Sequence, residues 1–208
     1  MYYGERFNSI SHLVGAVLAV AGFGALLTVS IPSRDIALII SFSVFGLTLV
    51  LLYTMSTLYH SLRPHKVKSI FRKLDHITIY LLIAGTYTPY MVVSLGGMVG
   101  YRMLAIVWGL ALLGLLLDVL NPNRIEILQL VIYLFMGWIC VFEFAALRES
   151  LPTPGLWWLT IGGIAYTSGI IFYVLDDRQI LKHSHGIWHI FVLVGSVAHF
   201  ISIIGFVR

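Results

Sequence analysis

Charged residues are scarce in this sequence. Asp, Glu, Lys and Arg make up 11% of its 208 residues, whereas a soluble domain carries about 25%. Cysteine occurs once, at Cys140, so no disulfide can form within the chain. Hydrophobic residues reach 59%, and the mean hydropathy is +0.95. These values exclude a water-soluble globule, a disordered chain and a disulfide-stapled secreted module, and they predict an integral membrane protein.

Long apolar runs divide the chain into segments near the roughly 20 residues that a membrane-spanning helix needs. Turn and charge signals separate these runs, and none of them shows the ten-residue alternation of an outer-membrane strand. We therefore expect an all-α membrane protein, a seven-transmembrane helix bundle that forms one domain over residues 1–208. The expected spans are residues 10–31, 36–62, 74–95, 103–120, 127–147, 156–175 and 186–207.

The basic residues favour one orientation in the membrane. Nine of the 13 Lys and Arg residues lie in the N-terminus and in the second, fourth and sixth loops, and four lie on the other side. The positive-inside rule then places the N-terminus in the cytoplasm and the C-terminus outside. The net charge of +4 is explained by this topology and by contact with anionic membrane lipids, so we expect no nucleic-acid partner.

Several polar residues fall inside the expected spans, where ionisable groups are costly and mark functional sites. They share one depth at the cytoplasmic ends of four spans. His60 closes the second span with Ser56 one turn earlier, and His185 and His189 open the seventh on one helical face. Asp75 opens the third span, and the first span begins with Glu5, Asn8 and His12 on a common face.

Three imidazoles and a carboxylate at one depth are typical of a catalytic zinc site. Such a zinc takes three protein ligands and leaves the fourth position to water. His185 and His189 can chelate one ion, and His60 can complete the set. Asp75 can orient or deprotonate the bound water, and Ser56 can hydrogen-bond the water, Asp75 or a substrate carbonyl.

Each of these residues also has a simpler interpretation. A His-x₃-His pair occurs in helices that bind no metal, Asp75 can be a charge favoured by the dipole at a helix N-terminus, and Ser56 can be a packing residue. His12 is expected either to pair with Asn8 or Glu5 or to bond between helices. His199, roughly 15 Å deeper than His189 along the last span, is expected to make a packing hydrogen bond. Residues expected to be solvated or interfacial are His65, His76, Asp118 and His183.

The order and spacing of these motifs resemble the hemolysin III family, the bacterial branch of the progesterone and adipoQ receptor family. The resemblance covers nearly the whole chain. It implies a multi-pass protein of the bacterial inner membrane with Zn²⁺ held by His60, His185 and His189, and with Asp75 and Ser56 beside it. Members often carry two acidic residues before the first span, where this chain has Gly4 and Glu5, so a role for the first acid is not implied.

The same superfamily contains alkaline ceramidases, which hydrolyse a lipid amide. The resemblance therefore implies a metal-dependent hydrolase that takes a lipid amide or ester from the cytoplasmic leaflet. Two other hypotheses stay open: a hemolysin-like, pore-forming cytolytic protein, and a membrane-homeostasis sensor in which the zinc is structural. A haem protein is a further possibility, because paired histidines in membranes can hold haem. The sequence does not indicate an oligomeric state.

Overall fold

The computed structural model describes residue 1, residues 4–120 and residues 126–208. The described residues form helices and no strands, and seven helical segments are long and apolar enough to cross a membrane. The predicted all-α, seven-span class is thus confirmed, while the turn expected at 121–124 lies outside the described residues. The elements are α1 (Arg6–Ser30), η1 (Ile31–Ser33), α2 (Ile36–Ser61), α3 (His65–Pro89), η2 (Tyr90–Leu95), α4 (Gly97–Leu120), α5 (Glu126–Trp138), η3 (Ile139–Glu143), α6 (Phe144–Ser150), α7 (Thr153–Asp177) and α8 (Ser184–Phe206).

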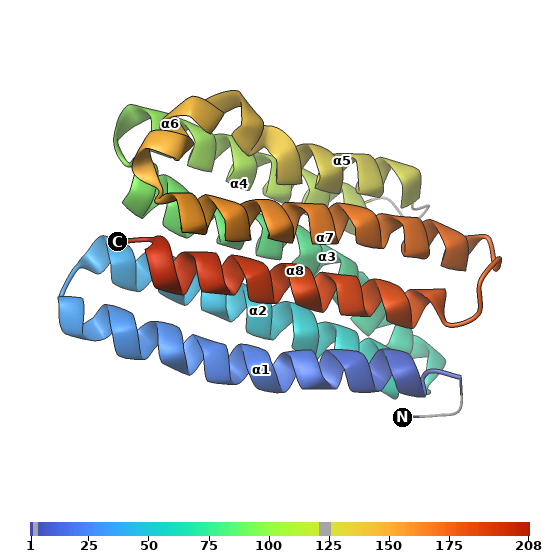
Figure 1. The fold of residues 1–208 in the computed structure, drawn as a ribbon. Coiled ribbons are helices and arrows are strands. Elements are labelled where there is room, and N and C mark those ends of the chain that lie inside the picture. Colours follow the sequence, from blue (N-terminus) through green and yellow to red (C-terminus); the bar gives the residue numbers. More distant parts are fainter. Residues whose placement is uncertain (2–3, 121–125) are drawn as a thin grey trace.

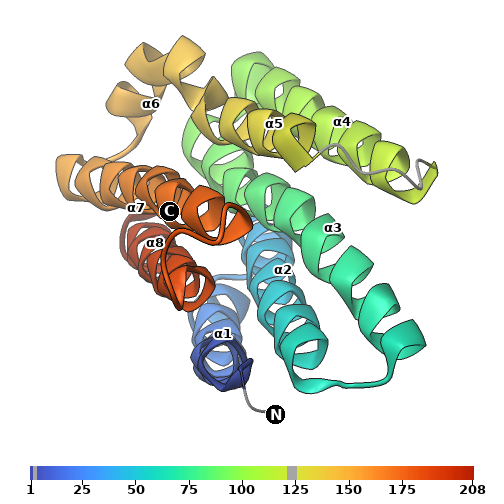
Figure 2. The same ribbon diagram turned by 90° about the vertical axis from the view of Figure 1, so that its right-hand side faces the viewer.

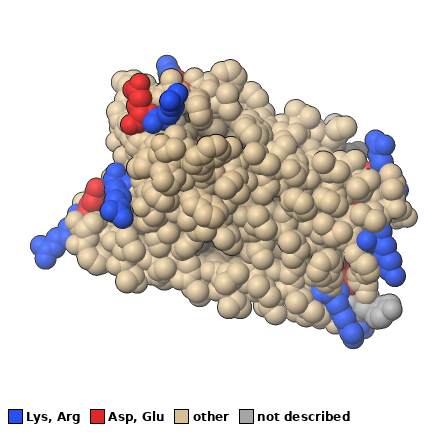
Figure 3. All heavy atoms as spheres, in the orientation of Figure 1, with Lys and Arg blue, Asp and Glu red and all other residues tan. Residues whose placement is uncertain are grey.

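The helices form an elongated bundle with the chain termini at opposite ends (Figure 1). Helix α8 packs against α7 and α1, and α2 packs against α1 and α3. Helices α4 and α5 lie beyond α3, on the side away from α1 (Figure 2). Charged side chains gather at the two ends of the bundle and leave an apolar band between them (Figure 3). This is the surface expected of a membrane-spanning bundle, with polar groups kept to the interfaces.

The turn between α2 and α3 differs from the sequence prediction. Leu62 is extended and Pro64 precedes α3, so the proline ends one helix and starts the next. Helix α3 begins at His65, nine residues before the expected start at 74, because a basic amphipathic stretch continues the helix beyond the apolar run. Asp75 therefore lies ten residues into α3, too far from its N-terminus for the helix-dipole interpretation.

Two spans are interrupted rather than continuous. After Pro89 the third span continues as the π-helical η2, which ends at Leu95 and is followed by Gly96 with a φ of 58°. The fifth span, expected as one helix over 127–147, is divided into α5, η3 and α6. The hydroxyl of Tyr87 bridges this break: it donates to the Gly137 carbonyl at 3.0 Å and accepts from the Cys140 amide at 3.1 Å. Backbone groups freed inside a membrane need such partners.

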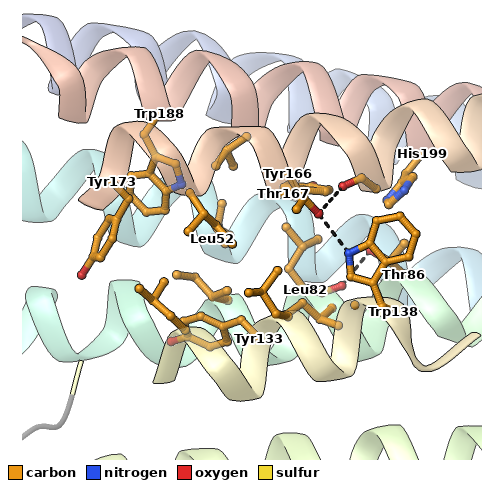
Figure 4. A pocket seen from close by; sticks show the side chains of 18 of the residues that line it. Leu52, Leu82, Thr86, Tyr133, Trp138, Tyr166, Thr167, Tyr173, Trp188 and His199 are labelled. Atoms are coloured by element: carbon orange, nitrogen blue, oxygen red, sulfur yellow. Dashed lines mark hydrogen bonds between the residues drawn. The ribbon is translucent and has the colours of Figure 1, made fainter. Parts of the chain in front are cut away.

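A cavity of about 370 Å³ runs along the inside of the bundle. Its walls come mainly from α3, α5, α7 and α8, and its lining is largely apolar and aromatic (Figure 4). His12, Asp75 and His185 line one end, and His199 belongs to its wall further along α8. The fold thus connects the cluster of polar residues at the helix ends with a long apolar space.

Candidate metal centre

The end of α2 and the start of α8 bring His60, His185 and His189 together. His60 is the last but one residue of α2, and the other two lie in the first two turns of α8. The ring centroids of His60 lie 5.0 Å from those of both other rings, and His185 and His189 are 4.7 Å apart. One ligand atom from each residue lies within 4.8 Å of the others. The three residues, called the His triad below, can hold one ion.

Each triad residue uses its Nδ1 atom for a contact with a protein oxygen. His60 Nδ1 lies 2.7 Å from Glu5 Oε2, and His185 Nδ1 lies 3.0 Å from Asp176 Oδ2. His189 Nδ1 lies 3.1 Å from Ser11 Oγ and 3.2 Å from the Asn8 carbonyl. An oxygen at Nδ1 fixes the tautomer and the ring orientation, so that Nε2 presents its lone pair.

The second ring nitrogen of each triad residue, Nε2, has no hydrogen-bond partner among the described residues. The Nε2 atoms of His60, His185 and His189 are all buried. A buried polar atom without a partner carries a desolvation cost of about 1–3 kcal/mol. Three such atoms, each on a ring held from behind by an oxygen, fit the donor set that Zn²⁺ takes, three imidazole nitrogens with an open fourth position.

Glu5 is the centre of the contacts behind His60. Its carboxylate accepts from Asn8 Nδ2 at 2.8 Å and from Lys68 Nζ at 3.0 Å, in addition to its contact with His60. Burial alone raises the pKa of Glu5, but the hydrogen bonds from His60, Asn8 and Lys68 outweigh it and hold this pKa below its ordinary value. Glu5 therefore stays a carboxylate that orients His60.

Close packing against α1 positions the end of α2 and the start of α8. Ser9 Oγ donates to the His60 carbonyl at 2.8 Å and ties α1 to the end of α2. Gly186 allows α8 to approach α1, since an added Cβ would lie 2.1 Å from Cδ1 of Phe7. Without a side chain at this position, the start of α8 reaches Asn8 and Ser11.

His12 lies at the triad but makes no hydrogen bond to Asn8 or Glu5. Its ring is buried and stacks on His189, with centroids 3.5 Å apart and planes 15° apart, while Tyr53 packs against it edge-on. Both of its nitrogens lack a hydrogen-bond partner among the described residues. The pairing predicted for His12 is therefore replaced by stacking, which restricts the ring of His189.

Asp75 and Ser56 occupy different positions relative to the triad. Asp75 is buried on α3 and lines the cavity whose wall also includes His185. Ser56 is fully buried on α2 one turn before His60, and its hydroxyl has no hydrogen-bond partner among the residues described. Ser56 is thus one helical turn from the triad, while Asp75 shares the wall of the cavity with His185.

Sequence reasoning missed Asp176 and Ser11. Asp176, the last residue but one of α7, contacts His185 Nδ1 and accepts from the Ser184 hydroxyl, the latter at 3.1 Å. The acidic pair at 176–177 is typical of a solvated loop, and a six-residue loop separates it from α8. Ser11 is one of many small residues in an apolar span, so no sequence signal distinguishes it.

The fold and the site define a class: a membrane protein of seven apolar helical spans with a largely buried His triad at one end of its bundle. The family model described as Haemolysin-III related matches residues 2–200, and the chain belongs to this family. The predicted resemblance is confirmed, and the protein is a multi-pass bacterial membrane protein of the hemolysin III type.

Individual relatives match over nearly the whole chain. The chain is 37% identical to "Hemolysin-3" of Bacillus cereus over 98% of its own length and 91% of that protein. It is 40% identical to "Hemolysin-3 homolog" of Bacillus subtilis (strain 168), over 96% and 92% respectively. It is 28% identical to "Monocyte to macrophage differentiation factor" of Homo sapiens, over 97% and 83%.

Proposed function

We propose that this protein is a zinc-dependent hydrolase that cleaves an amide or ester bond of a membrane lipid. The observation that carries the proposal is the set of three buried Nε2 atoms without partners on rings whose Nδ1 atoms contact protein oxygens. A zinc ion held there would act as a Lewis acid toward a substrate carbonyl. It would also lower the pKa of a water bound to it, so that hydroxide is available at neutral pH.

The protein's own residues orient the reactants and move the proton. Glu5, Asp176 and the Asn8 carbonyl hold the three rings in place, so little reorganisation is needed during reaction. The Asp75 carboxylate, in the cavity wall, takes a proton from water and returns it to the leaving amine or alcohol. The Ser56 hydroxyl, which has no hydrogen-bond partner among the described residues, would donate to the water or to the substrate carbonyl.

The cavity supports a lipid as substrate. It is long, mostly apolar and continuous with the triad end, so an acyl chain can lie in it with its carbonyl near the histidines. The excess of Lys and Arg on the N-terminal side of the predicted topology favours an orientation in which the substrate enters from the cytoplasmic leaflet. A polar, water-soluble metabolite would lose its hydration in so apolar a cavity and gain few hydrogen bonds there.

The names of the Bacillus relatives provide a second candidate, a cytolytic protein that permeabilises membranes. The two functions differ in a simple assay. Purified protein reconstituted into liposomes releases an encapsulated dye if it forms pores, and retains the dye while hydrolysing lipid if it is a hydrolase. Because His60 and His189 are buried inside the bundle and His185 is only partly exposed, we expect dye retention.

Metal analysis and a lipid screen test the proposal together. We expect about one zinc per chain in protein purified without chelator, and none in the alanine variants of His60, His185 and His189. His65→Ala, at an exposed position at the start of α3, is the matched control and keeps the metal. Asp75→Asn should keep zinc and lose hydrolysis of a panel of lipid amides and esters. If the parent protein binds zinc but hydrolyses none of these lipids, the metal is structural and the hydrolase proposal is wrong.

A further inference from the structure

One face of α7 lines the cavity over most of the length of the helix. Its members recur at intervals of three or four residues and therefore lie on one side of the helix. Gly163 is in the middle of this face, so a side chain at position 163 would point into the cavity. The members of the face that carry the argument are Leu156, Leu159, Gly163, Tyr166, Ile170 and Tyr173.

Two consecutive glycines of α7 have different surroundings. A Cβ added at Gly162 would lie 2.1 Å from Cδ2 of His199, so Gly162 is needed for close packing against α8. His199 also contacts the Leu159 carbonyl through Nε2 at 3.1 Å, which matches its predicted packing role. A Cβ added at Gly163 would instead approach Cζ2 of Trp138 to 3.8 Å, an ordinary van der Waals distance. Helix packing therefore does not require glycine at position 163, and the cavity has room for a side chain there.

Trp138, at the end of α5, lines the cavity beside Gly163 and is held in place by α7. Its Nε1 donates to Thr167 Oγ1 at 3.0 Å (Figure 4). The same hydroxyl donates to the Gly163 carbonyl at 2.8 Å, so the indole ring is connected to the backbone that it lies against. The cavity at this depth is thus bounded by a fixed ring on one side and by bare backbone on the other.

The depth of Gly163 can be expressed as a chain length. Asp176, which contacts His185 of the triad, follows Gly163 by 13 residues, so the two positions are about 20 Å apart along α7. An extended acyl chain advances about 1.3 Å per carbon, because its carbon–carbon bonds are about 1.5 Å long and its bond angles are about 111°. A chain whose carbonyl lies at the triad therefore reaches Gly163 at about its fifteenth carbon.

The cavity continues beyond Gly163. Leu156, about 30 Å from Asp176 along α7, still lines it, and so does Leu147 on α6. Each methylene that leaves water for an apolar cavity strengthens binding up to about fourfold. The carbons of a long chain obtain this gain in the far part of the cavity only if the chain passes between Gly163 and Trp138.

We propose that Gly163 determines the length of acyl chain that the cavity accepts, because the absence of a side chain lets the chain pass Trp138. The inference rests on the part of the proposed function that places an acyl chain in the cavity with its carbonyl near the triad. It adds the substrate class: lipids with straight acyl chains of about 16 to 22 carbons. A shorter chain leaves the part of the cavity beyond Gly163 unfilled.

Binding of fatty acids tests this inference without hydrolysis. The probes are dodecanoic, tetradecanoic, hexadecanoic and octadecanoic acid, each displacing a short-chain fluorescent fatty acid from detergent-purified protein. The measured quantity is the ratio of the dissociation constants of variant and parent for each acid, in which the partition of the acid into detergent cancels. Gly163→Leu places a branched side chain beside Trp138. We expect it to weaken binding of octadecanoic acid about tenfold or more and to leave dodecanoic acid within about twofold of the parent.

Further variants separate an effect of depth from general damage. Ile170→Trp fills the same face only about 9 Å from Asp176, so it should weaken dodecanoic and octadecanoic acid alike. Gly109→Leu, at an exposed position on α4, is the matched control and should bind all four acids like the parent. Thermal unfolding identifies any variant that fails to fold. If Gly163→Leu does so, Gly163→Ala replaces it, because its methyl group has room, and it should weaken octadecanoic acid alone by about fourfold.

The outcomes separate this inference from the hydrolase. Equal weakening of all four acids by a folded Gly163→Leu variant, or weakening of none, overturns the role of Gly163 while leaving the hydrolase standing. A loss confined to the longer acids, in a protein that hydrolyses no lipid, supports the role of Gly163 and removes the hydrolase. Failure of the parent protein to bind any of the acids overturns both, since the cavity would then not hold acyl chains.

Discussion

The triad end of the bundle and the fifth span are built in opposite ways. At the triad, residues far apart in sequence are connected through side chains: α1 contacts the ends of both α2 and α8, and α7 contacts α8. The fifth span is broken at η3, and the Tyr87 hydroxyl connects the break to α3. The first region is arranged to hold three rings rigidly, whereas the second is a wall of the cavity with fewer constraints.

Removal of the proposed metal is expected to give the largest contrast between the two regions. A ligand at about a thousand times its dissociation constant stabilises the folded state by about 4 kcal/mol. We expect a strong chelator to lower the unfolding temperature and to speed amide hydrogen exchange at the starts of α1 and α8 and the end of α2. Exchange at residues 137–143 should change little. A uniform change over both regions would contradict a local metal site at the triad.

Replacing the carboxylates that contact the Nδ1 atoms of the triad is expected to have the next largest effect. Asp176→Asn and Glu5→Gln keep the size of the side chain but remove the charge that orients His185 and His60. Loss of such partners weakens metal affinity by about 10- to 100-fold. Zinc competition with a fluorescent chelator measures the change.

Asp177→Asn is the matched control, because this neighbouring carboxylate is exposed. It should bind zinc like the parent protein. If Asp176→Asn and Asp177→Asn weaken zinc binding equally, the effect is one of overall charge and the contact with His185 has no special role.

How far the sequence predicts this structure differs between the same two regions. The spans and the triad could be predicted because apolar length and the cost of polar groups in a membrane constrain them strongly. His60, His185 and His189 are predicted from their common depth and from the four-residue spacing of the last two. Asp176 and Ser11 could not be found, because their roles depend on which helices pack together. The breaks at η2 and η3 were also missed, since the hydropathy of residues 90–95 and 139–143 gives no sign of them.

Tyr87→Phe tests the fifth span itself. The substitution removes the hydroxyl that serves both Gly137 and Cys140, and the freed backbone groups have no water to replace it. We expect a loss of about 1–3 kcal/mol in the free energy of unfolding and faster exchange over residues 137–143. Zinc affinity should be unchanged, and Tyr101→Phe, at an exposed position on α4, should behave like the parent.

The smallest effect is expected at the ion pair between Arg102 on α4 and Glu143 in η3. It touches the broken span from outside, and the Arg102 side chain is 59% exposed, so water and salt screen the attraction. Arg102→Gln should cost less than about 1 kcal/mol in the free energy of unfolding, and high salt should erase the difference from the parent. A loss as large as that of Tyr87→Phe would mean that the exposed ion pair stabilises the fifth span as much as the Tyr87 hydrogen bonds do. The fifth span would then depend on side-chain contacts as strongly as the triad end does.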